Sequence, residues 1–336
     1  MPRGSGDGNG DGNGEGVYMR PGQRDHDRKK DALKAAAVFL QSILRTGYKI
    51  PASPSTSTHS ISHLFRFITM AKFNKLAGKH VVVIGGSKGI GRGVVEAAIE
   101  SNARVTLAGS SQQSADAAVS SIKAEYPSAQ VVGLGCDLSK PSIEQDLDAL
   151  LTRAAGLTGE IDHIVFTAAD GLPIGTLDDL TPEVAMKTAH MRFLVPLMLG
   201  KAAKKHLAGA VNGKPGVGKD KSLILTTGTI ASKPAPGWSM LAYFGAGLKG
   251  LTRNLALDLA PIRVNAVEPG LVNTEIWDKS FPSIEEREAG LQQMAGHLPT
   301  GKPATPDEVA EAYVYFLRDS NTTGEVVQTR GGAHLI

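Results

Sequence analysis

A short apolar run followed by closely spaced glycines constrains the fold of this chain more than any other feature. Residues 81–84 are Val-Val-Val-Ile, a helical pattern begins near residue 94, and between them stand glycines at positions 85, 86, 89 and 91. The run predicts a buried parallel strand that turns tightly into a helix. Glycines permit that turn and let a phosphate approach the N–H groups at the helix start. Strand, loop and helix in this order predict a dinucleotide-binding loop, with an ordinary glycine-rich turn as the alternative.

Apolar runs and helical patterns alternate along the rest of the chain. We expect strands at residues 80–85, 104–109, 130–135, 161–167, 222–227, 262–267 and 324–329. We expect helices at residues 90–101, 113–125, 142–155, 183–208, 239–258 and 306–318. This alternation indicates right-handed βαβ crossovers. The sequence therefore predicts an α/β fold, a single doubly wound parallel sheet of about seven strands with helices on both faces. Residues 209–221 are expected to form a surface loop.

The composition changes sharply near residue 70. Residues 4–16 are almost entirely Gly, Asp, Asn and Glu, and residues 51–58 are rich in Pro, Ser and Thr. Such segments bury too little apolar surface to fold by themselves, although residues 26–46 have a helical pattern. We expect residues 1–69 to be a disordered or misassigned N-terminal extension and residues 70–336 to be the functional domain.

Charge and cysteine content exclude several classes of protein. The formal net charge is only +3, and no basic stripe with interleaved aromatics is present, so we expect no nucleic-acid partner. The single cysteine, Cys136, excludes an intrachain disulfide and a zinc site built from several cysteines, and no metal is expected. No apolar run is long enough to span a bilayer. A soluble, cytoplasmic protein that does not bind membranes is expected.

Five motifs in order resemble one family. They are Gly85-Gly-Ser-Lys-Gly-Ile-Gly91, Asp137-Leu138, Arg263-Val-Asn-Ala-Val-Glu-Pro-Gly270 with Val272 and Thr274, residues 304–310, and residues 323–332. Together they resemble the short-chain dehydrogenase/reductase superfamily over about residues 73–336. The resemblance implies a Rossmann-type fold that binds a nicotinamide cofactor. It implies cofactor contacts from Gly85, Ser87, Lys88, Gly89, Ile90, Gly91, Asp137, Leu138, Val272 and Thr274.

Residues after the second strand bear on the choice of cofactor. An NAD enzyme typically places Asp or Glu there to bind the ribose hydroxyls, whereas this chain has Ser110 and Ser111. Lys88 and Arg92 flank the last glycines of the loop. Cations and hydroxyl donors suit a 2′-phosphate, so the sequence favours NADP(H) over NAD(H). The alternative is that both cations are solvated residues at a helix start.

The proton-transfer residues of the family are missing. The family uses Ser, Tyr-x-x-x-Lys and Asn, and the lysine lowers the tyrosine pKa so that the phenol transfers a proton. When the motifs are aligned, Leu241 stands at the tyrosine position and Gly245 at the lysine position. Gly228, or its neighbour Thr227, takes the serine position, and Arg192 takes the asparagine position.

Three residues remain candidates for catalysis. Tyr243 lies two residues late, which turns it about 200° around the helix, so packing or an interface is the alternative role. Asp170 follows the fourth strand, where ligands of open α/β sheets bind, and it is a candidate proton donor or cation stabiliser or else a solvated turn residue. Arg192 is the third candidate. Two aromatics, Trp238 and Trp277, belong to segments that cover the nicotinamide in the family and suggest a bulky apolar substrate.

An intact cofactor loop without the usual acid favours a pre-activated electrophile. Reduction of a ketone produces an alkoxide that needs a proton, whereas reduction of an iminium ion yields a neutral amine. The pattern resembles divergent natural-product reductases, including alkaloid reductases. The alternatives are a cyclase or isomerase that uses NADP(H) as a structural wall, and a non-catalytic NADPH-binding protein. The family resemblance implies a homodimer or homotetramer built on residues 183–208 and 239–258.

Overall fold

The computed structural model describes residues 72–208, 210–211, 214–215 and 218–336. The expected extension at residues 1–69, with its helical pattern at 26–46, lies outside the described residues and stays a prediction. Among the described helices, none combines the length and the apolar character needed to cross a bilayer.

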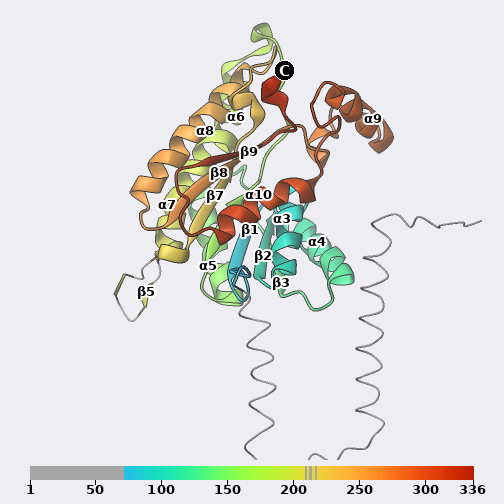
Figure 1. Ribbon diagram of the computed structural model, residues 1–336. Helices are drawn as coiled ribbons and strands as arrows, with labels where there is room; N and C mark the ends of the chain where they lie inside the picture. The colour runs from blue at the N-terminus through green and yellow to red at the C-terminus, as the bar shows by residue number, and fades with distance from the viewer. Residues whose placement is uncertain (1–71, 209, 212–213, 216–217) are drawn as a thin grey trace, which may run out of the picture. The chain divides into compact units, whose positions relative to one another are not determined.

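A seven-stranded parallel sheet forms the centre of the described domain (Figure 1). Its strands are β1 (His80–Ile84), β2 (Arg104–Gly109), β3 (Val131–Gly135), β4 (His163–Phe166), β7 (Ser222–Thr226), β8 (Arg263–Pro269) and β9 (Val326–Thr329). They lie in the order β3-β2-β1-β4-β7-β8-β9, which confirms the predicted doubly wound sheet. The order reverses between β1 and β4. Ligands of such sheets bind at that switch point, outside the carboxyl ends of the strands.

Three helices cover each face of the sheet. On one face lie α3 (Gly89–Glu100), α4 (Gln112–Glu125) and α10 (Pro306–Arg318), and on the other lie α5 (Ile143–Thr158), α7 (Val195–Leu207) and α8 (Ser239–Asp258). Each layer buries an aliphatic cluster; Val94 of α3 and Leu147 of α5 are fully buried. Burial of such a side chain contributes about 1.5–3 kcal/mol, so the two clusters hold the strand ends in fixed positions.

Local capping explains the sharp helix starts. The Thr305 hydroxyl accepts a hydrogen bond from the Glu308 N–H at the start of α10, and the Glu308 carboxylate accepts one from the Thr305 N–H. Pro306 takes the first helical position, where no N–H partner is needed. The predicted ranges 239–258 and 306–318 match α8 and α10.

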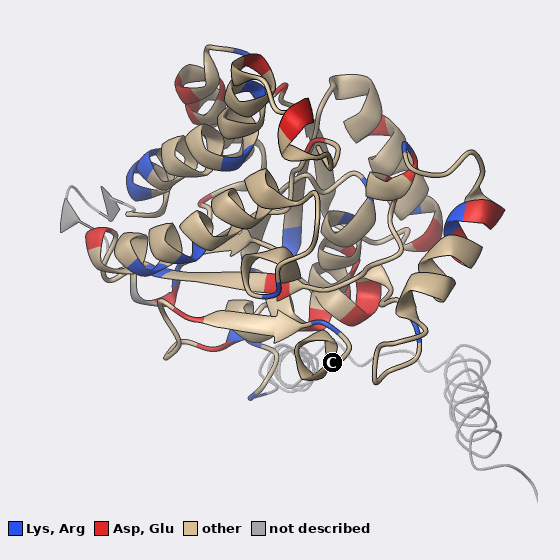
Figure 2. Ribbon diagram, turned by 90° about the horizontal axis from the view of Figure 1, so that it is seen from above, with Lys and Arg blue, Asp and Glu red and all other residues tan. Residues whose placement is uncertain are grey.

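Two predicted segments differ from the structure. The expected helix at 183–208 is divided into α6 (Pro182–Ala189), a π-helical turn at His190–Leu194 and α7. The expected loop at 209–221 contains the short antiparallel strands β5 (Ala210–Val211) and β6 (Lys214–Pro215). One helix, α9 (Ile284–Ala295), was not predicted. In the view of Figure 2, basic and acidic residues are interspersed over the outer helices and loops.

Candidate active site

The glycine loop places the start of α3 at the carboxyl end of β1. α3 begins at Gly89, whose φ of +55° is a left-handed conformation that favours glycine. A Cβ on Gly91 would lie 2.1 Å from the Gly85 carbonyl oxygen, so only glycine lets the helix approach the strand this closely. No acidic residue and no side-chain cap occupies the first turn of α3. Its N–H groups therefore suit an anionic diphosphate.

Ser87, Lys88 and Gly89 line a crevice of about 410 Å³ beside this helix start. Lys88 is exposed, and Ile90 lines a separate cavity described below. The donor set of backbone N–H groups, hydroxyl and ammonium fits the phosphates of a dinucleotide.

The residues predicted to contact the adenosine end of the cofactor follow β2 and β3. Ser110 is exposed, and the Ser111 hydroxyl accepts a hydrogen bond from the Ser114 N–H at 3.2 Å, which caps α4. Arg92 forms an ion pair with Glu96 at 2.5 Å, so its guanidinium is held along α3. Ser110 therefore remains open to a ribose phosphate, while Arg92 reaches one only by leaving Glu96.

Asp137 and Leu138 follow β3, as the resemblance implied. The Ser139 hydroxyl and N–H both donate to Asp137 Oδ1, at 2.7 and 3.0 Å, and these hydrogen bonds lower the pKa of the Asp137 carboxyl. Leu138 is buried, and its carbonyl oxygen lies 2.8 Å from His190 Nε2. The ionised Asp137 suits an adenine amino group as an acceptor.

A cavity of about 470 Å³ opens at the carboxyl ends of β4, β7 and β8. Large apolar side chains predominate in its wall; they include Phe166, Leu172, Met191, Leu241, Phe244, Leu248, Ile276 and Met294. The rings of Trp238 and Trp277 lie 6.4 Å apart at this cavity, and Trp277 Nε1 donates to the Val272 carbonyl at 3.2 Å. Both tryptophans therefore line the site, as the sequence suggested.

Four threonines of the cavity wall direct their hydroxyl protons away from the cavity. Thr227 donates to the Gly245 carbonyl at 2.9 Å, and Thr229 donates to the Pro269 carbonyl at 2.9 Å. Thr167 and Thr226 donate to the carbonyls at the ends of β1 and β4. These hydroxyls therefore have no proton left to donate to a bound molecule, and the Thr226 oxygen also lies 2.7 Å from the hydroxyl of Tyr313.

The two residues that the sequence places at the Tyr and Lys positions of the family, Leu241 and Gly245, carry no polar side chain. Leu241 and Gly245 both line the cavity. A Cβ on Gly245 would lie 3.1 Å from the Ala231 Cβ and 3.3 Å from Thr227 Oγ1, so the site is tightly packed there. Lys249, one turn further on, does not reach the cavity. It pairs with the fully buried Glu268.

The predicted catalytic role of Tyr243 does not agree with its position. Its side chain is 75% exposed, is not part of the cavity wall and packs edge-on against the ring of Phe244. Two residues beyond Leu241, the helix has turned the phenol away from the cavity. We therefore assign Tyr243 no catalytic role.

Arg192 and Asp170 come together at the cavity. Arg192 Nη2 lies 2.8 Å from Asp170 Oδ1 and donates to the Gly171 carbonyl at 3.0 Å. Burial lowers the pKa of the guanidinium, and the Asp170 carboxylate partly opposes that shift. Arg192 lines the cavity, whereas Asp170 lies outside its wall. Asp170 thus holds Arg192, and of the two side chains only the guanidinium lines the cavity.

Val272 and Thr274 connect the two parts of the site. Val272 is buried and pairs as an isolated bridge with Ala304, which fixes the loop after β8. The Thr274 Cβ would lie 3.4 Å from a Cβ on Gly89, so this loop meets the glycine loop directly. Both residues line the cavity beside the helix start. A nicotinamide bound there would face the apolar cavity.

Sequence reasoning missed two contributions to the site. Met294 of α9 lines the cavity, and Lys233 lies at its wall with Nζ donating to the Ala333 and Ile336 carbonyls. The polar sequence of α9 hides its only two buried residues, Leu291 and Ala295. Among the described residues, no group of three or more His, Cys, Asp or Glu side chains is placed to hold a metal ion.

Comparison with known proteins places this architecture in one family. A family model described as an SDR-like Rossmann domain matches residues 72–336. The chain is 37% identical to the short-chain dehydrogenase/reductase fsr5 of Gibberella fujikuroi, over 78% of this chain and 97% of that protein. It is similar to the solved MalC reductase/Diels-Alderase of Malbranchea aurantiaca, with 37% identity, a TM-score of 0.70, and coverage of 78% of this chain and 98% of that one.

A second solved structure is also similar. It is an NADPH-bound short-chain oxidoreductase of Pseudomonas aeruginosa described as containing an atypical catalytic center, with 25% identity, a TM-score of 0.67, and coverage of 76% of this chain and 96% of that one. Fold, motifs and relatives agree. The chain belongs to the short-chain dehydrogenase/reductase family.

Proposed function

We propose that this protein is an NADPH-dependent reductase of a bulky, largely apolar small molecule in secondary metabolism. Its reacting group would be a pre-activated electrophile such as an iminium ion. The observation that carries the proposal is the cavity wall. Leu241 and Gly245 replace the usual phenol and ammonium, and the hydroxyl of Thr227 is already donating to Gly245.

The choice of NADPH rests on the residues near the adenosine end. Ser110 and Lys88 are exposed, and no carboxylate follows β2 to repel a 2′-phosphate. Similar proteins support this choice, because one of them is described as NADPH-bound. When bound, the reduced nicotinamide would supply a hydride to a substrate held in the cavity.

The residues of the cavity suit a cationic electrophile that receives only a hydride. Reduction of a ketone develops negative charge on oxygen and requires a nearby acid. Reduction of an iminium ion instead removes a positive charge and leaves a neutral amine. The hydroxyl oxygens of Thr227 and Thr229, whose protons are already donated, would stabilise a nearby cation, and the apolar walls would exclude water. Arg192, neutralised by Asp170, remains a hydrogen-bond donor for a carbonyl group elsewhere on the substrate.

A cyclisation on the same scaffold is the second candidate function. The similar protein from Malbranchea aurantiaca is described as a reductase/Diels-Alderase. A rigid apolar cavity accelerates a cyclisation by holding the reacting carbons in one conformation, without any proton transfer. This activity would require NADP(H) only as a wall of the cavity. A non-catalytic NADPH-binding protein is the remaining alternative.

Assembly and location follow from the same proposal. We propose a cytoplasmic homodimer or homotetramer that uses the helices α7 and α8 and their flanking turns. The exposed aromatic side chains of Phe193 and Tyr243, 55% and 75% accessible, support an interface there. Nucleic acids and membranes are not proposed as partners.

Deuterium transfer tests the function directly. NADPH carrying deuterium at either face of C4 is mixed with cyclic iminium ions and with matched ketones in single-turnover experiments. Deuterium in the amine product from one labelled face, with little or no alcohol from the ketones, is the expected result. Cyclised product without deuterium favours the cyclase. Tight NADPH binding without any turnover favours the non-catalytic protein.

A further inference from the structure

A carboxylate lies beside the N-terminus of α3, where the proposed cofactor would place its diphosphate. A Cβ on Gly89, the first residue of α3, would lie 3.4 Å from Glu275 Oε2. No side chain caps the N–H groups of this first turn. A helix N-terminus attracts negative charge of any origin, whether it comes from a ligand or from the chain itself. The Glu275 carboxylate therefore lies beside the helix start at which the diphosphate would bind, without capping its N–H groups by a hydrogen bond.

The backbone around Glu275 is fixed. Glu275 begins the 3-10 helix Glu275–Trp277, and its neighbour Thr274 is 8% exposed. Trp277, at the end of that turn, is 9% exposed and donates to the Val272 carbonyl. With both sides of the turn anchored, rotation of the Glu275 side chain is the smallest movement that takes its carboxylate away from α3.

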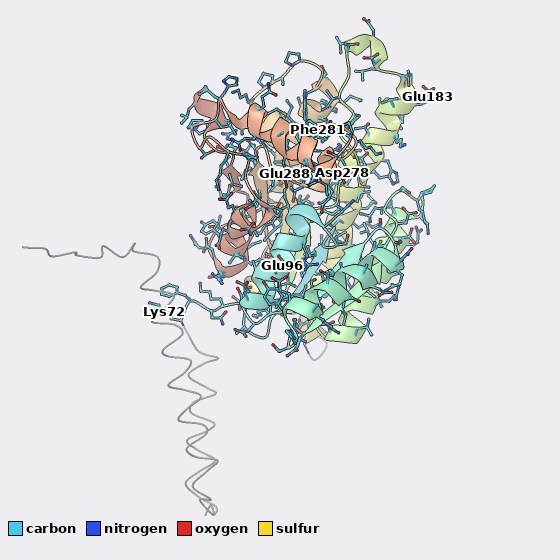
Figure 3. The ribbon with its side chains drawn as sticks, turned by 90° about the vertical axis from the view of Figure 1, so that its right-hand side faces the viewer. Lys72, Glu96, Glu183, Asp278, Phe281 and Glu288 are labelled. Atoms are coloured by element: carbon cyan, nitrogen blue, oxygen red, sulfur yellow. The ribbon has the colours of Figure 1, made fainter. Side chains whose placement is uncertain are left out.

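Within the described part of the chain, no cation of this crevice forms an ion pair with Glu275. Two cations of the crevice wall are occupied: Arg92 pairs with Glu96, and Arg287 of α9 pairs with Asp278. The wall residues that have no ion pair within the described part of the chain are Lys88, Glu275 and Asp307. Two carboxylates thus oppose one ammonium. Figure 3 shows Glu96 on α3 below the segment that carries Asp278 and Glu288.

We propose that Glu275 competes with the diphosphate of NADPH from within the protein. While the site is free, its carboxylate interacts favourably with the start of α3. When the cofactor binds, the diphosphate repels the carboxylate, and the interaction with α3 is lost. Glu275 therefore weakens cofactor binding and speeds cofactor release. This inference rests on the proposed function, because it requires that the chain bind NADPH.

The consequence concerns turnover. An oxidoreductase must exchange its cofactor in every cycle, and release often limits the rate once the chemistry is fast. A resident anion shortens the lifetime of the bound state without changing any group at the reacting carbon. Electrostatic competition of this kind is screened by salt, so the effect of Glu275 decreases as ionic strength rises.

The substitution Glu275→Gln tests the inference through binding. It keeps the shape of the side chain and removes its charge. Calorimetric titration with NADPH at low salt is expected to show binding about 3- to 10-fold tighter than in wild type, with slower release in stopped-flow displacement. The ligand-free variant is expected to melt about 1–2 °C lower, because the helix start loses its carboxylate.

Glu288→Gln is the matched control. Glu288 is an exposed residue of α9, outside the crevice wall, and its substitution changes the net charge by the same amount. Equal tightening in both variants would reduce the effect to net charge and overturn the inference. So would unchanged or weaker NADPH binding by Glu275→Gln when wild type binds well. If wild type binds no NADPH, the proposed cofactor itself fails.

Discussion

Arg192 Nη2 contacts Asp170 Oδ1 at 2.8 Å, and only the arginine of this pair lines the cavity. Arg192 belongs to the π-helical turn that interrupts the expected long helix. Such turns are frequent at functional sites because the extra residue changes which side chains face inward. The turn and the carboxylate together direct a hydrogen-bond donor, whose charge Asp170 compensates, into a mostly apolar site.

Substitutions of Asp170 and Arg192 are predicted to affect the reaction through the Arg192 guanidinium alone. Arg192→Ala should slow single-turnover hydride transfer about 10- to 100-fold by loss of substrate orientation. Asp170→Asn should have a smaller effect in the same direction, and the double variant should be no slower than Arg192→Ala. Single-turnover rates at saturating NADPH measure this. Additive losses would show that Asp170 acts on the substrate independently.

A carboxylate after β2 is predicted to change the cofactor preference. Ser110→Asp places a negative charge where the 2′-phosphate of NADPH is expected, so NADPH binding should weaken at least about 10-fold while NADH binding improves. Fluorescence titration with both cofactors measures the two affinities. Ser110→Asn, which adds similar bulk without charge, is the control. Equal affinities of wild type for the two cofactors would contradict the proposed NADPH preference.

Removal of the exposed phenol is predicted to leave catalysis intact. Tyr243→Phe should change the turnover number by less than about twofold, since a general acid would cost about 10²- to 10⁴-fold. Steady-state rates of the iminium reduction measure the effect. A large loss of activity, with the assembly state unchanged by light scattering, would return Tyr243 to the site.

Substitution by alanine is predicted to lower the unfolding free energy at Gly91 but to leave it nearly unchanged at Gly228. Gly91→Ala brings a Cβ to 2.1 Å from the Gly85 carbonyl oxygen, so it should cost about 2–3 kcal/mol of unfolding free energy and disrupt NADPH binding. Gly228→Ala meets no atom within 4 Å and should stay within about 0.5 kcal/mol of wild type. Urea denaturation compares them. Equal stabilities would contradict the close approach of α3 to β1.

A buried histidine is predicted to make stability depend on pH. Burial lowers the pKa of His163 from 6.5 to about 3, and its Nδ1 lies 2.9 Å from Ser222 Oγ. Below pH 6.5 the imidazole of His163 binds a proton in the unfolded chain but stays neutral in the folded chain. The contribution of the neutral His163 to stability is therefore fully present above pH 6.5. The free energy of unfolding then falls between pH 6.5 and about pH 3, by up to about 1.4 kcal/mol per pH unit.

His163→Asn should reduce the pH dependence of the unfolding free energy by the equivalent of about one bound proton. Urea denaturation at pH 7.5 and pH 5.5 gives the difference for each protein. Burial also lowers the pKa of His80, so part of the slope remains in the variant. His297→Asn, at an exposed position, is the control and should keep the wild-type difference. An unchanged slope in His163→Asn would show that the imidazole is protonated in the folded state.

Repeating patterns made most of the fold predictable. Seven apolar runs predicted the seven strands, because the five central strands are almost entirely buried and the edge strands β3 and β9 are partly buried. The π-helical turn at His190–Leu194 adds a single residue to a helix, and periodicity over a long helix does not resolve that. The helix α9 buries only Leu291 and Ala295, too little for an amphipathic pattern.

The sequence predicted which residues lie at the candidate site but not the directions of their side chains and hydroxyl groups. Leu241 and Gly245, which the sequence places at the Tyr and Lys positions of the family, line the cavity together, as a spacing of four residues on a helix predicts. The hydroxyl direction of Thr227 depends on the carbonyl of a distant helix, and no local pattern encodes it. The pairing of Asp170 with Arg192 likewise depends on a contact between a loop and a helix turn 22 residues away.

The tight packing around Gly245 has a consequence for the cavity wall. A lysine there would place its Cβ 3.1 Å from the Ala231 Cβ, and Lys249 is already engaged with Glu268. A lysine at position 245 would therefore require the turn that carries Ala231 to shift by a few tenths of an ångström. Residue 245 and the turn before α8 are in this way coupled, so a change in the chemistry of the cavity wall at this point also changes the shape of the cavity.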